Sequence, residues 1–300
     1  MTLADELITV RDLLRYATSR FGSAGLVFGH GTAGPIDEAA FLILEGLHLP
    51  VDDINPWLDA RLTSSERQHL LALFEARIVT RKPAPYLVGK AYIQGIPFRV
   101  DERVIVPRSF IAELLLSGTL GPEGLGLIPD AGGVGSVLDL CTGSGCLAII
   151  AAMYFGQADV DAVDLSPQAL KVARLNVDDH GLADRIRLKR GDLFKPVGSA
   201  RYDLILTNPP YVAAAEVAAF PPEYAGEPQM AHLGGADGLD LVRTILAQAA
   251  RHLTPTGGLI CEVGTGRALL EAEFPHLPFT WLDTEASEGE VFWLERRDLM

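Results

Sequence analysis

The sequence predicts an α/β protein in which a small helical domain and a β-hairpin linker precede an open, mostly parallel sheet. Apolar residues recur at helical spacing through the first 80 residues, and from residue 137 onward short apolar runs alternate with helical patterns. Such alternation is typical of strand-helix-strand units. With 300 residues, 30 of them glycine and 19 proline, the chain is longer than one core usually serves. We therefore expect a helical domain at 1–84, the linker at 85–107 and an α/β domain at 108–300.

The amino-terminal domain is expected to contain helices over residues 3–20, 35–47 and 64–80, because apolar residues repeat there every three or four positions. Ser64 is a candidate cap for the last of them. Residues 86–106 then alternate between apolar and polar side chains, which predicts a β-hairpin. The histidines of this region have no carboxylate or cysteine at metal-ligand spacing, so we assign them to the core or the surface: His30, His48 and His69.

The first expected strand of the α/β domain, starting at Val137, runs into a glycine turn and then into a helical pattern. Gly143 and Gly145 permit a tight turn and a close backbone approach to a ligand, and the following helix N-terminus presents unpaired N–H groups. Together with Ala148 these glycines satisfy the loose dinucleotide fingerprint, so a nicotinamide or flavin site is one interpretation. A turn that serves only strand-to-helix packing is another.

Polar side chains close the next three apolar runs. Asp164 ends the first of them and precedes Ser166-Pro167, which is typical of a helix cap followed by proline at the first helical position. Asp192 and Asn208 close the other two. Ligands of open α/β sheets bind at the carboxyl ends of the strands. At that edge Asp164 suits the two hydroxyls of a ribose and Asp192 an amino group of adenine, so we expect a nucleoside ligand.

The most informative motif is Asn208-Pro209-Pro210-Tyr211, which follows an apolar run. Prolines lack an amide donor, so the backbone there offers carbonyl oxygens and almost no N–H groups. Asn208 adds a side-chain oxygen acceptor, and Tyr211 adds a flat ring that can cover a planar group. The motif therefore predicts a planar NH2 group as guest. In the alternative interpretation Asn208 is only a turn residue before prolines.

Residues 212–233 lack a sustained period, and we expect them to form a loop over the site. The run at 185–190 alternates basic and apolar side chains, which a half-exposed strand explains without nucleic acid. The remaining patterns predict a helix at 238–253, a break at 254–258, a buried strand at 259–263 and a closing pair of strands at 279–283 and 291–295.

Composition points to a soluble protein of the cytoplasm that makes no contact with membranes. No uncharged apolar run of about 18 residues is present, and acidic residues precede the first apolar stretch, unlike in a secretory signal. Cys141, Cys146 and Cys261 lie in expected buried elements and lack the paired spacing of a zinc site. We expect three reduced cysteines, no disulfide and no metal.

The formal net charge of −14 is divided unevenly along the chain. Residues 1–107 hold 11 Lys and Arg against 13 Asp and Glu, whereas residues 108–300 hold 14 against 26. An acidic field repels phosphate backbones and attracts cationic partners, although acidic surfaces also simply keep proteins in solution. The charge therefore disfavours direct binding of DNA and favours a basic protein as partner.

At these strand ends the chain resembles the class I S-adenosylmethionine-dependent methyltransferases, whose Rossmann-like sheet has seven strands, one of them antiparallel near an edge. Its Asn-Pro-Pro-Tyr motif is similar to that of members that methylate planar amino groups. Longer stretches resemble the protein-glutamine N5-methyltransferases, most of all the branch named PrmB, which modifies a glutamine of the third large-subunit ribosomal protein, uL3. These stretches are residues 28–32, 37–40, 86–90, 97–113, 139–146 and 221–224.

The resemblance implies S-adenosylmethionine as cofactor and an amino-terminal domain that orients the substrate. A sister branch that acts on peptide-release factors usually shows glycine where Cys141 stands, so Cys141 favours the ribosomal-protein branch. Catalysis is assigned by the resemblance to Asn208, Pro209, Pro210 and Tyr211. Cofactor binding is assigned to Asp139, Cys141, Thr142, Gly143, Ser144, Gly145, Asp164, Leu165, Asp192, Leu193, Asn208, Arg108 and Phe110.

We therefore expect methyl transfer to the side-chain amide nitrogen of a glutamine in a basic ribosomal protein, uL3. If the Asn208 side-chain oxygen and the Pro209 carbonyl hold both amide hydrogens, they orient the nitrogen lone pair without a general base. Two alternatives remain open at this point. One is a methyltransferase for release-factor glutamine or for DNA amino groups, and the other is a non-catalytic ribosome-assembly factor that binds a basic protein.

Overall fold

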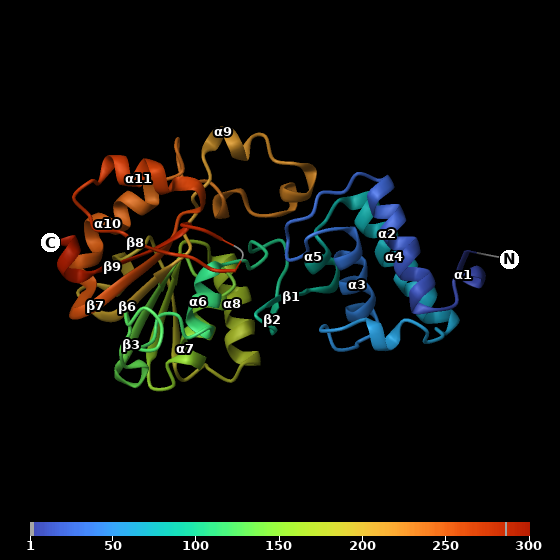
Figure 1. The fold of residues 1–300 in the computed structure, drawn as a ribbon, viewed down its shortest axis with the longest axis horizontal. Coiled ribbons are helices and arrows are strands. Elements are labelled where there is room, and N and C mark those ends of the chain that lie inside the picture. Colours follow the sequence, from blue (N-terminus) through green and yellow to red (C-terminus); the bar gives the residue numbers. More distant parts are fainter. Residues whose placement is uncertain (1–2, 286) are drawn as a thin grey trace. The chain divides into compact units, whose positions relative to one another are not determined.

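The computed structural model describes residues 3–285 and 287–300, and its contacts divide the chain into two compact units (Figure 1). The first unit runs up to Glu102 and also contains Phe220–Glu227. The second unit comprises Arg103–Ala219 and Pro228–Met300. Each unit has its own cluster of buried apolar side chains.

The first unit is mainly helical. Its first predicted helix, at residues 3–20, is interrupted, because Thr9 accepts a hydrogen bond from the Asp12 N–H and thereby begins a new helix. The cap before the helix expected at 64–80 is Thr63 and not Ser64. Both helix starts are capping boxes, in which a carboxylate at the third position bonds back to the capping residue. The helices are α1 (Leu3–Glu6), α2 (Val10–Ser23), α3 (Pro35–Gly46), α4 (Ser64–Thr80) and α5 (Ala84–Val88).

A two-stranded antiparallel hairpin follows, formed by β1 (Lys90–Ile93) and β2 (Ile96–Arg99). Gln94 and Gly95, both with positive φ, make its two-residue turn. The hairpin is shorter than the 86–106 expected from alternation, because the residues before it form α5 and those after it leave the sheet.

The segment expected to form one loop at 212–233 is divided between the units. Its middle part, Phe220–Glu227, belongs to the helical unit. There the buried Glu223 accepts a hydrogen bond from the Val27 N–H at 3.1 Å and another from Arg81 Nη1 at 3.0 Å. The chain therefore leaves the second unit after residue 219 and returns to it at residue 228.

The second unit is built on a seven-stranded sheet with the order β5-β4-β3-β6-β7-β9-β8. β9 is antiparallel to both of its neighbours, and the other pairs are parallel, which confirms the α/β class and the antiparallel strand near one edge. The strands are β3 (Ser136–Leu140), β4 (Asp159–Asp164), β5 (Ile186–Arg190), β6 (Tyr202–Thr207), β7 (Leu253–Glu262), β8 (Thr280–Leu282) and β9 (Val291–Glu295).

Helices pack on the sheet, and side chains of β3 alternate between its two faces. Leu138 and Leu140 join the buried cluster beneath α10 (Asp240–His252) and α11 (Arg267–Glu273). Asp139 lies on the opposite face, where it bonds to the start of α7 (Cys146–Tyr154). The other helices of this unit are α6 (Phe110–Leu116), α8 (Pro167–Asp179) and α9 (Ala214–Val217).

The helix expected at 238–253 ends at His252, so residues 254–258 break the helical pattern as expected. The strand expected at 259–263 begins earlier, because β7 starts at Leu253 and runs through this segment with an irregular register opposite β6. The glycines there serve packing: a Cβ on Gly258 would lie 2.0 Å from the Trp293 ring. The closing strand pair and the half-exposed strand near 185–190 are found as expected, as β8 with β9 and as the edge strand β5.

Candidate active site

Asp139 anchors the turn after β3. It is fully buried, and its Oδ2 accepts hydrogen bonds from Thr142 Oγ1 and from the Ala148 N–H. Its Oδ1 is buried and has no hydrogen-bond partner among the described residues. Burial raises the pKa of Asp139 to about 7, even though the Thr142 and Ala148 bonds lower it. One strong acceptor therefore remains unused at the tip of β3.

The turn itself takes a left-handed path, with positive φ at Cys141, Gly143 and Gly145. A Cβ on Gly143 would find no atom closer than 4.0 Å, whereas one on Gly145 would lie 3.2 Å from Ala173 Cβ. Gly143 thus leaves open space above the turn, and Gly145 permits close packing on α8. Ser144, between them, is buried, and its carbonyl accepts a hydrogen bond from Asn176. A non-glycine residue in this conformation costs about 1 kcal/mol, so Cys141 stands where glycine is the less strained choice.

Asp164 joins the tips of β3 and β4. Its carboxylate accepts a hydrogen bond from the Gly143 N–H at 2.8 Å and one from the Ser166 N–H at 2.7 Å. Burial raises the pKa of Asp164, and these backbone bonds lower it. Ser166 caps α8 with Pro167 in the first turn, as the sequence predicted. The side chain of Leu165, beside the carboxylate, is largely exposed.

Three carboxylates from different strand ends surround Cys141. Burial is the first cause that raises the pKa of the Cys141 thiol, and Asp164, Asp139 and Asp192 raise it further. Asp192 is half exposed and forms an ion pair with Lys195. The next residue, Leu193, is buried with a positive φ of 45°. The structure therefore brings the predicted cofactor residues of the first three strand ends to one edge of the sheet.

The Asn208-Pro209-Pro210-Tyr211 motif leaves the sheet directly after β6. Asn208 Nδ2 donates a hydrogen bond to the Arg108 carbonyl at 3.1 Å, which places the start of α6 beside the motif. The Tyr211 hydroxyl donates to Glu262 Oε1 at 3.1 Å. Predicted residues from segments about 100 positions apart are thus joined by hydrogen bonds.

Glycines pack tightly around the same motif. A Cβ on Gly234 would lie 2.7 Å from the Pro210 carbonyl oxygen, and one on Gly264 would lie 2.7 Å from Tyr211 Cε2. Gly264 also has a positive φ of 52°. The backbone of residue 264 therefore supports one side of the Tyr211 ring, and no larger residue fits there without displacing it.

Glu262 was missed by sequence reasoning. It is the last residue of β7 and is 1% exposed. The signal that marks Asp164 and Asp192, a carboxylate closing an apolar run, is present here too. Val263 continues the apolar run past it, and the glycines at 264 and 266 were the remaining sign that the strand ends here.

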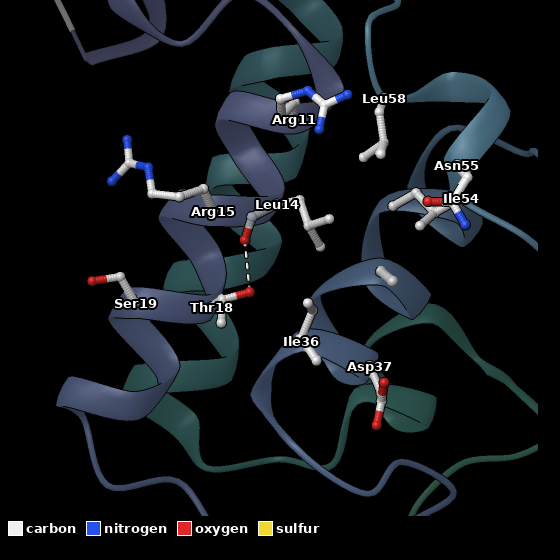
Figure 2. A pocket seen from close by; sticks show the side chains of 11 residues that line it. Arg11, Leu14, Arg15, Thr18, Ser19, Ile36, Asp37, Ile54, Asn55 and Leu58 are labelled. Carbon is white, nitrogen blue, oxygen red and sulfur yellow. Dashed lines mark hydrogen bonds between the residues drawn. The ribbon is translucent and has the colours of Figure 1, made fainter.

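A separate cavity of about 720 Å³ lies in the helical unit, between α2, α3 and residues 54–58 (Figure 2). Leu14 and Ile36 line it beside Arg11, which forms an ion pair with Asp59. It belongs to the first unit, whereas every predicted site residue belongs to the second.

Within residues 3–285 and 287–300, no group of three or more His, Cys, Asp or Glu side chains is placed to hold a metal ion. None of the helices described in the structure has the length and apolarity needed to cross a membrane.

Comparisons with known proteins find related domains. The model of the methyltransferase small domain matches residues 127–220. A solved methyltransferase structure from Pyrococcus furiosus aligns with a TM-score of 0.48 and 19% identity over 74% of this chain and 97% of that one.

Two curated relatives are similar over almost their whole length, and both are named ribosomal protein uL3 glutamine methyltransferase. The protein from Bradyrhizobium diazoefficiens is 58% identical over 98% of this chain and 92% of its own length. The protein from Neisseria meningitidis serogroup B is 52% identical over 99% of this chain and 96% of its own. The resemblance found in the sequence motifs is thereby confirmed, and the chain belongs to the family of ribosomal protein uL3 glutamine methyltransferases.

Proposed function

We propose that this protein transfers a methyl group from S-adenosylmethionine to the side-chain amide nitrogen of a glutamine in ribosomal protein uL3. The observation that carries the proposal is the fixed orientation of Asn208. A backbone carbonyl only accepts hydrogen bonds, so the Asn208 atom that faces the Arg108 carbonyl is the NH2 group. The Asn208 side-chain oxygen is then left as an acceptor for a guest.

The residues at the sheet edge fit the methyl donor. A nucleoside with an amino-acid side chain offers ribose hydroxyls, an adenine amino group and an ammonium group. The tips of β3, β4 and β5 supply Asp139, Asp164 and Asp192, and the Asp139 Oδ1 atom is a buried acceptor without a partner among the described residues. The open space above Gly143 leaves room for a close approach to the backbone.

The role of each residue follows from this chemistry. We assign Asp164 to the ribose hydroxyls, Asp192 to the adenine, and Asp139 with the 141–145 turn to the amino-acid part, where Arg108 and Phe110 border the pocket. The donor supplies an electrophilic methyl group on a sulfonium. The carboxylates around the 141–145 turn also favour the cationic form of such a ligand, since opposite charges attract in a partly buried site.

An amide nitrogen is a poor nucleophile because its lone pair is delocalised into the carbonyl group. Asn208 Oδ1 and the Pro209 carbonyl are the acceptors that would hold its two hydrogens. Held in this way, the nitrogen presents its lone pair in one direction, so catalysis is by orientation and electrostatics. Tyr211 covers the amide plane. The methylated nitrogen is acidic enough to lose its proton to water, so none of these residues has to act as a base.

The acidic second unit suits this substrate. Residues 108–300 carry 26 Asp and Glu against 14 Lys and Arg, and such a surface steers a basic protein toward it while repelling nucleic acid. Ribosomal proteins are made in the cytoplasm, which is where we place the reaction.

The test is to offer the purified protein three substrates with radiolabelled methyl donor: uL3, a peptide-release factor, and duplex DNA. We expect label in uL3, on a glutamine side-chain nitrogen when the modified peptide is sequenced by mass spectrometry. Label in the release factor or in DNA, but not in uL3, would show that the substrate is that molecule and not uL3. Binding of uL3 without label would indicate an assembly factor instead.

A further inference from the structure

The carboxylate of Glu262 connects three segments of the second unit. Ser109 Oγ donates a hydrogen bond to Glu262 Oε2 at 2.7 Å, and the Phe110 N–H donates to the same oxygen at 3.0 Å. The Tyr211 hydroxyl donates to the other oxygen, Oε1, at 3.1 Å. One side chain at the end of β7 therefore holds the start of α6 and the end of the Asn-Pro-Pro-Tyr motif.

Through these bonds Glu262 reaches both ends of the motif. Tyr211 is bonded to it directly. Asn208 is bonded to the carbonyl of Arg108, whose neighbour Ser109 is bonded to Glu262. Gly264, two residues after Glu262, supports the Tyr211 ring from one side, so the ring is fixed at its face and at its hydroxyl by the same short segment.

An ionised carboxylate matches the surroundings of Glu262. It only accepts hydrogen bonds, and its three partners are an N–H and two hydroxyls that can donate. The pKa of Glu262 is raised to about 7 as the net result of opposing effects: burial and, to a smaller extent, Glu290 raise it, whereas the three hydrogen bonds lower it. Arg108 lowers the pKa of the Tyr211 hydroxyl and Glu290 raises it. Glu262 in turn raises the pKa of the Cys261 thiol.

We propose that Glu262 is a positioning residue for methyl transfer: its ionised carboxylate orients the Tyr211 ring directly and the Asn208 amide through residues 108–110. This inference rests on the proposed function, because it concerns the geometry with which the same motif holds the substrate amide. Both Tyr211 and Asn208 need a defined orientation to align a planar guest.

Protonation of Glu262 changes this arrangement. The neutral acid carries a hydrogen on one oxygen and loses the charge that strengthens its hydrogen bonds. If the hydrogen is on Oε1, the Tyr211 hydroxyl must turn to accept it; if it is on Oε2, the Ser109 hydroxyl must turn in the same way or compete with the Phe110 N–H for the remaining lone pair. Because the pKa lies near 7, the methylation rate is expected to rise as the pH increases through that value.

The test compares wild type with Glu262→Gln under saturating substrate at pH 6 to 9. Glutamine keeps the shape but removes the charge, and its NH2 group replaces one accepting oxygen, so the hydroxyl that faces it must turn and accept. We expect kcat to fall by about tenfold or more at pH 8, as small misplacements of reacting groups do, with the KM for the methyl donor changed by less than about twofold. The rise of kcat with pH near pH 7 should disappear in this variant.

Glu290→Gln is the matched control, since it removes a nearby carboxylate that makes none of the bonds to Ser109, Phe110 or Tyr211. It should keep the wild-type kcat at high pH. The rise of kcat with pH should move to lower pH, because Glu290 raises the pKa of Glu262. The double variant of Glu262→Gln with Tyr211→Phe should be little slower than the slower single variant, because both remove one bond. Additive losses would count against the inference.

An unchanged kcat and pH profile in Glu262→Gln overturns the positioning role while leaving the proposed function intact. Wild-type protein that does not label uL3 refutes the function itself, so the two failures are distinguishable. Thermal unfolding identifies a variant that does not fold. In that case Tyr211→Phe, which deletes the same bond from the other side, decides: unchanged turnover there overturns the inference.

Discussion

Asn208 Nδ2 donates a hydrogen bond to the Arg108 carbonyl at 3.1 Å, across 100 positions of sequence. This bond determines which end of the amide faces the substrate. It occupies the Asn208 NH2 group, the only end that could not accept hydrogens from another amide. The motif is therefore an acceptor site because of a contact outside the motif.

Replacing Asn208 tests that contact. Asn208→Ala should lower methyl transfer by about two orders of magnitude, as loss of a transition-state hydrogen bond often does, and leave the affinity for the methyl donor nearly unchanged. Asn208→Asp should be as slow, because it places a carboxylate oxygen against the Arg108 carbonyl. Single-turnover rates and calorimetric affinities measure the two effects. Wild-type turnover in Asn208→Ala would remove the residue from the mechanism.

Asp164 is expected to affect cofactor binding and not the chemical step. Asp164→Asn keeps the shape but removes the charge that accepts from Gly143 and Ser166. The affinity for S-adenosylmethionine should fall by about 10- to 100-fold, the range for a hydrogen bond to a charged group. Titration calorimetry measures it, with the exposed Asp178→Asn as control. Equal affinities for the two variants would argue against a ribose contact.

Gly264→Ala should disturb Tyr211. The added Cβ would lie 2.7 Å from the ring, and the positive φ of 52° is strained for alanine. We expect slower turnover and a loss of roughly 1–3 kcal/mol in the free energy of unfolding. Gly22→Ala is the control, because it sits within α2 with open space around it and should be neutral or slightly stabilising. Denaturant unfolding and kcat check both, and a fully active Gly264→Ala would show that the ring position is unimportant.

Breaking a buried ion pair should destabilise the helical unit. Arg77 Nε donates to Glu38 Oε1 at 2.6 Å, and both side chains are almost completely buried. Glu38→Ala leaves the guanidinium buried without this partner and should cost about 3 kcal/mol or more. Removing the exposed pair partner Asp59 should have little effect. Urea unfolding of the two variants makes the comparison, and similar midpoints would contradict it.

The pH dependence of stability provides another check. Burial raises the pKa of Glu262 from 4.5 to about 7, so between these values the folded state binds more protons than the unfolded state. The contribution of Glu262 to the free energy of unfolding is complete below about pH 4.5 and is lost as the pH rises through 7. Glu262→Gln removes this dependence, so its free energy of unfolding relative to wild type should increase from pH 5 to pH 8. Unfolding titrations in urea measure the difference, and a flat or falling difference would mean that Glu262 is ionised well below pH 7.

The turn after β3 and the polar residues at the sheet edge were predictable because local chemistry encodes them, whereas the partner and the cofactor were expected from the family resemblance. A proline pair after Asn208 removes donors, Gly143 and Gly145 permit a left-handed turn, and Asp164 closes an apolar run, whatever the rest of the chain does. Periodicity likewise predicted the order of strands along the chain. Its errors lie at element ends, such as the helix interrupted at Thr9, where capping chemistry and not periodicity sets the boundary.

By itself, then, the sequence determined the fold class, the family resemblance and the polar residues Asp164, Asp192 and Asn208 that lie at the ends of three of the strands. Only the tertiary structure decided how buried carboxylates are held: Glu262 accepts a hydrogen bond from Ser109, 153 positions away, and Glu223, in the part of residues 212–233 that belongs to the helical unit, accepts one from Arg81. The physical reason is that a buried carboxylate is stable only beside its donors, and which distant segments bring those donors is fixed by the packing of the whole chain.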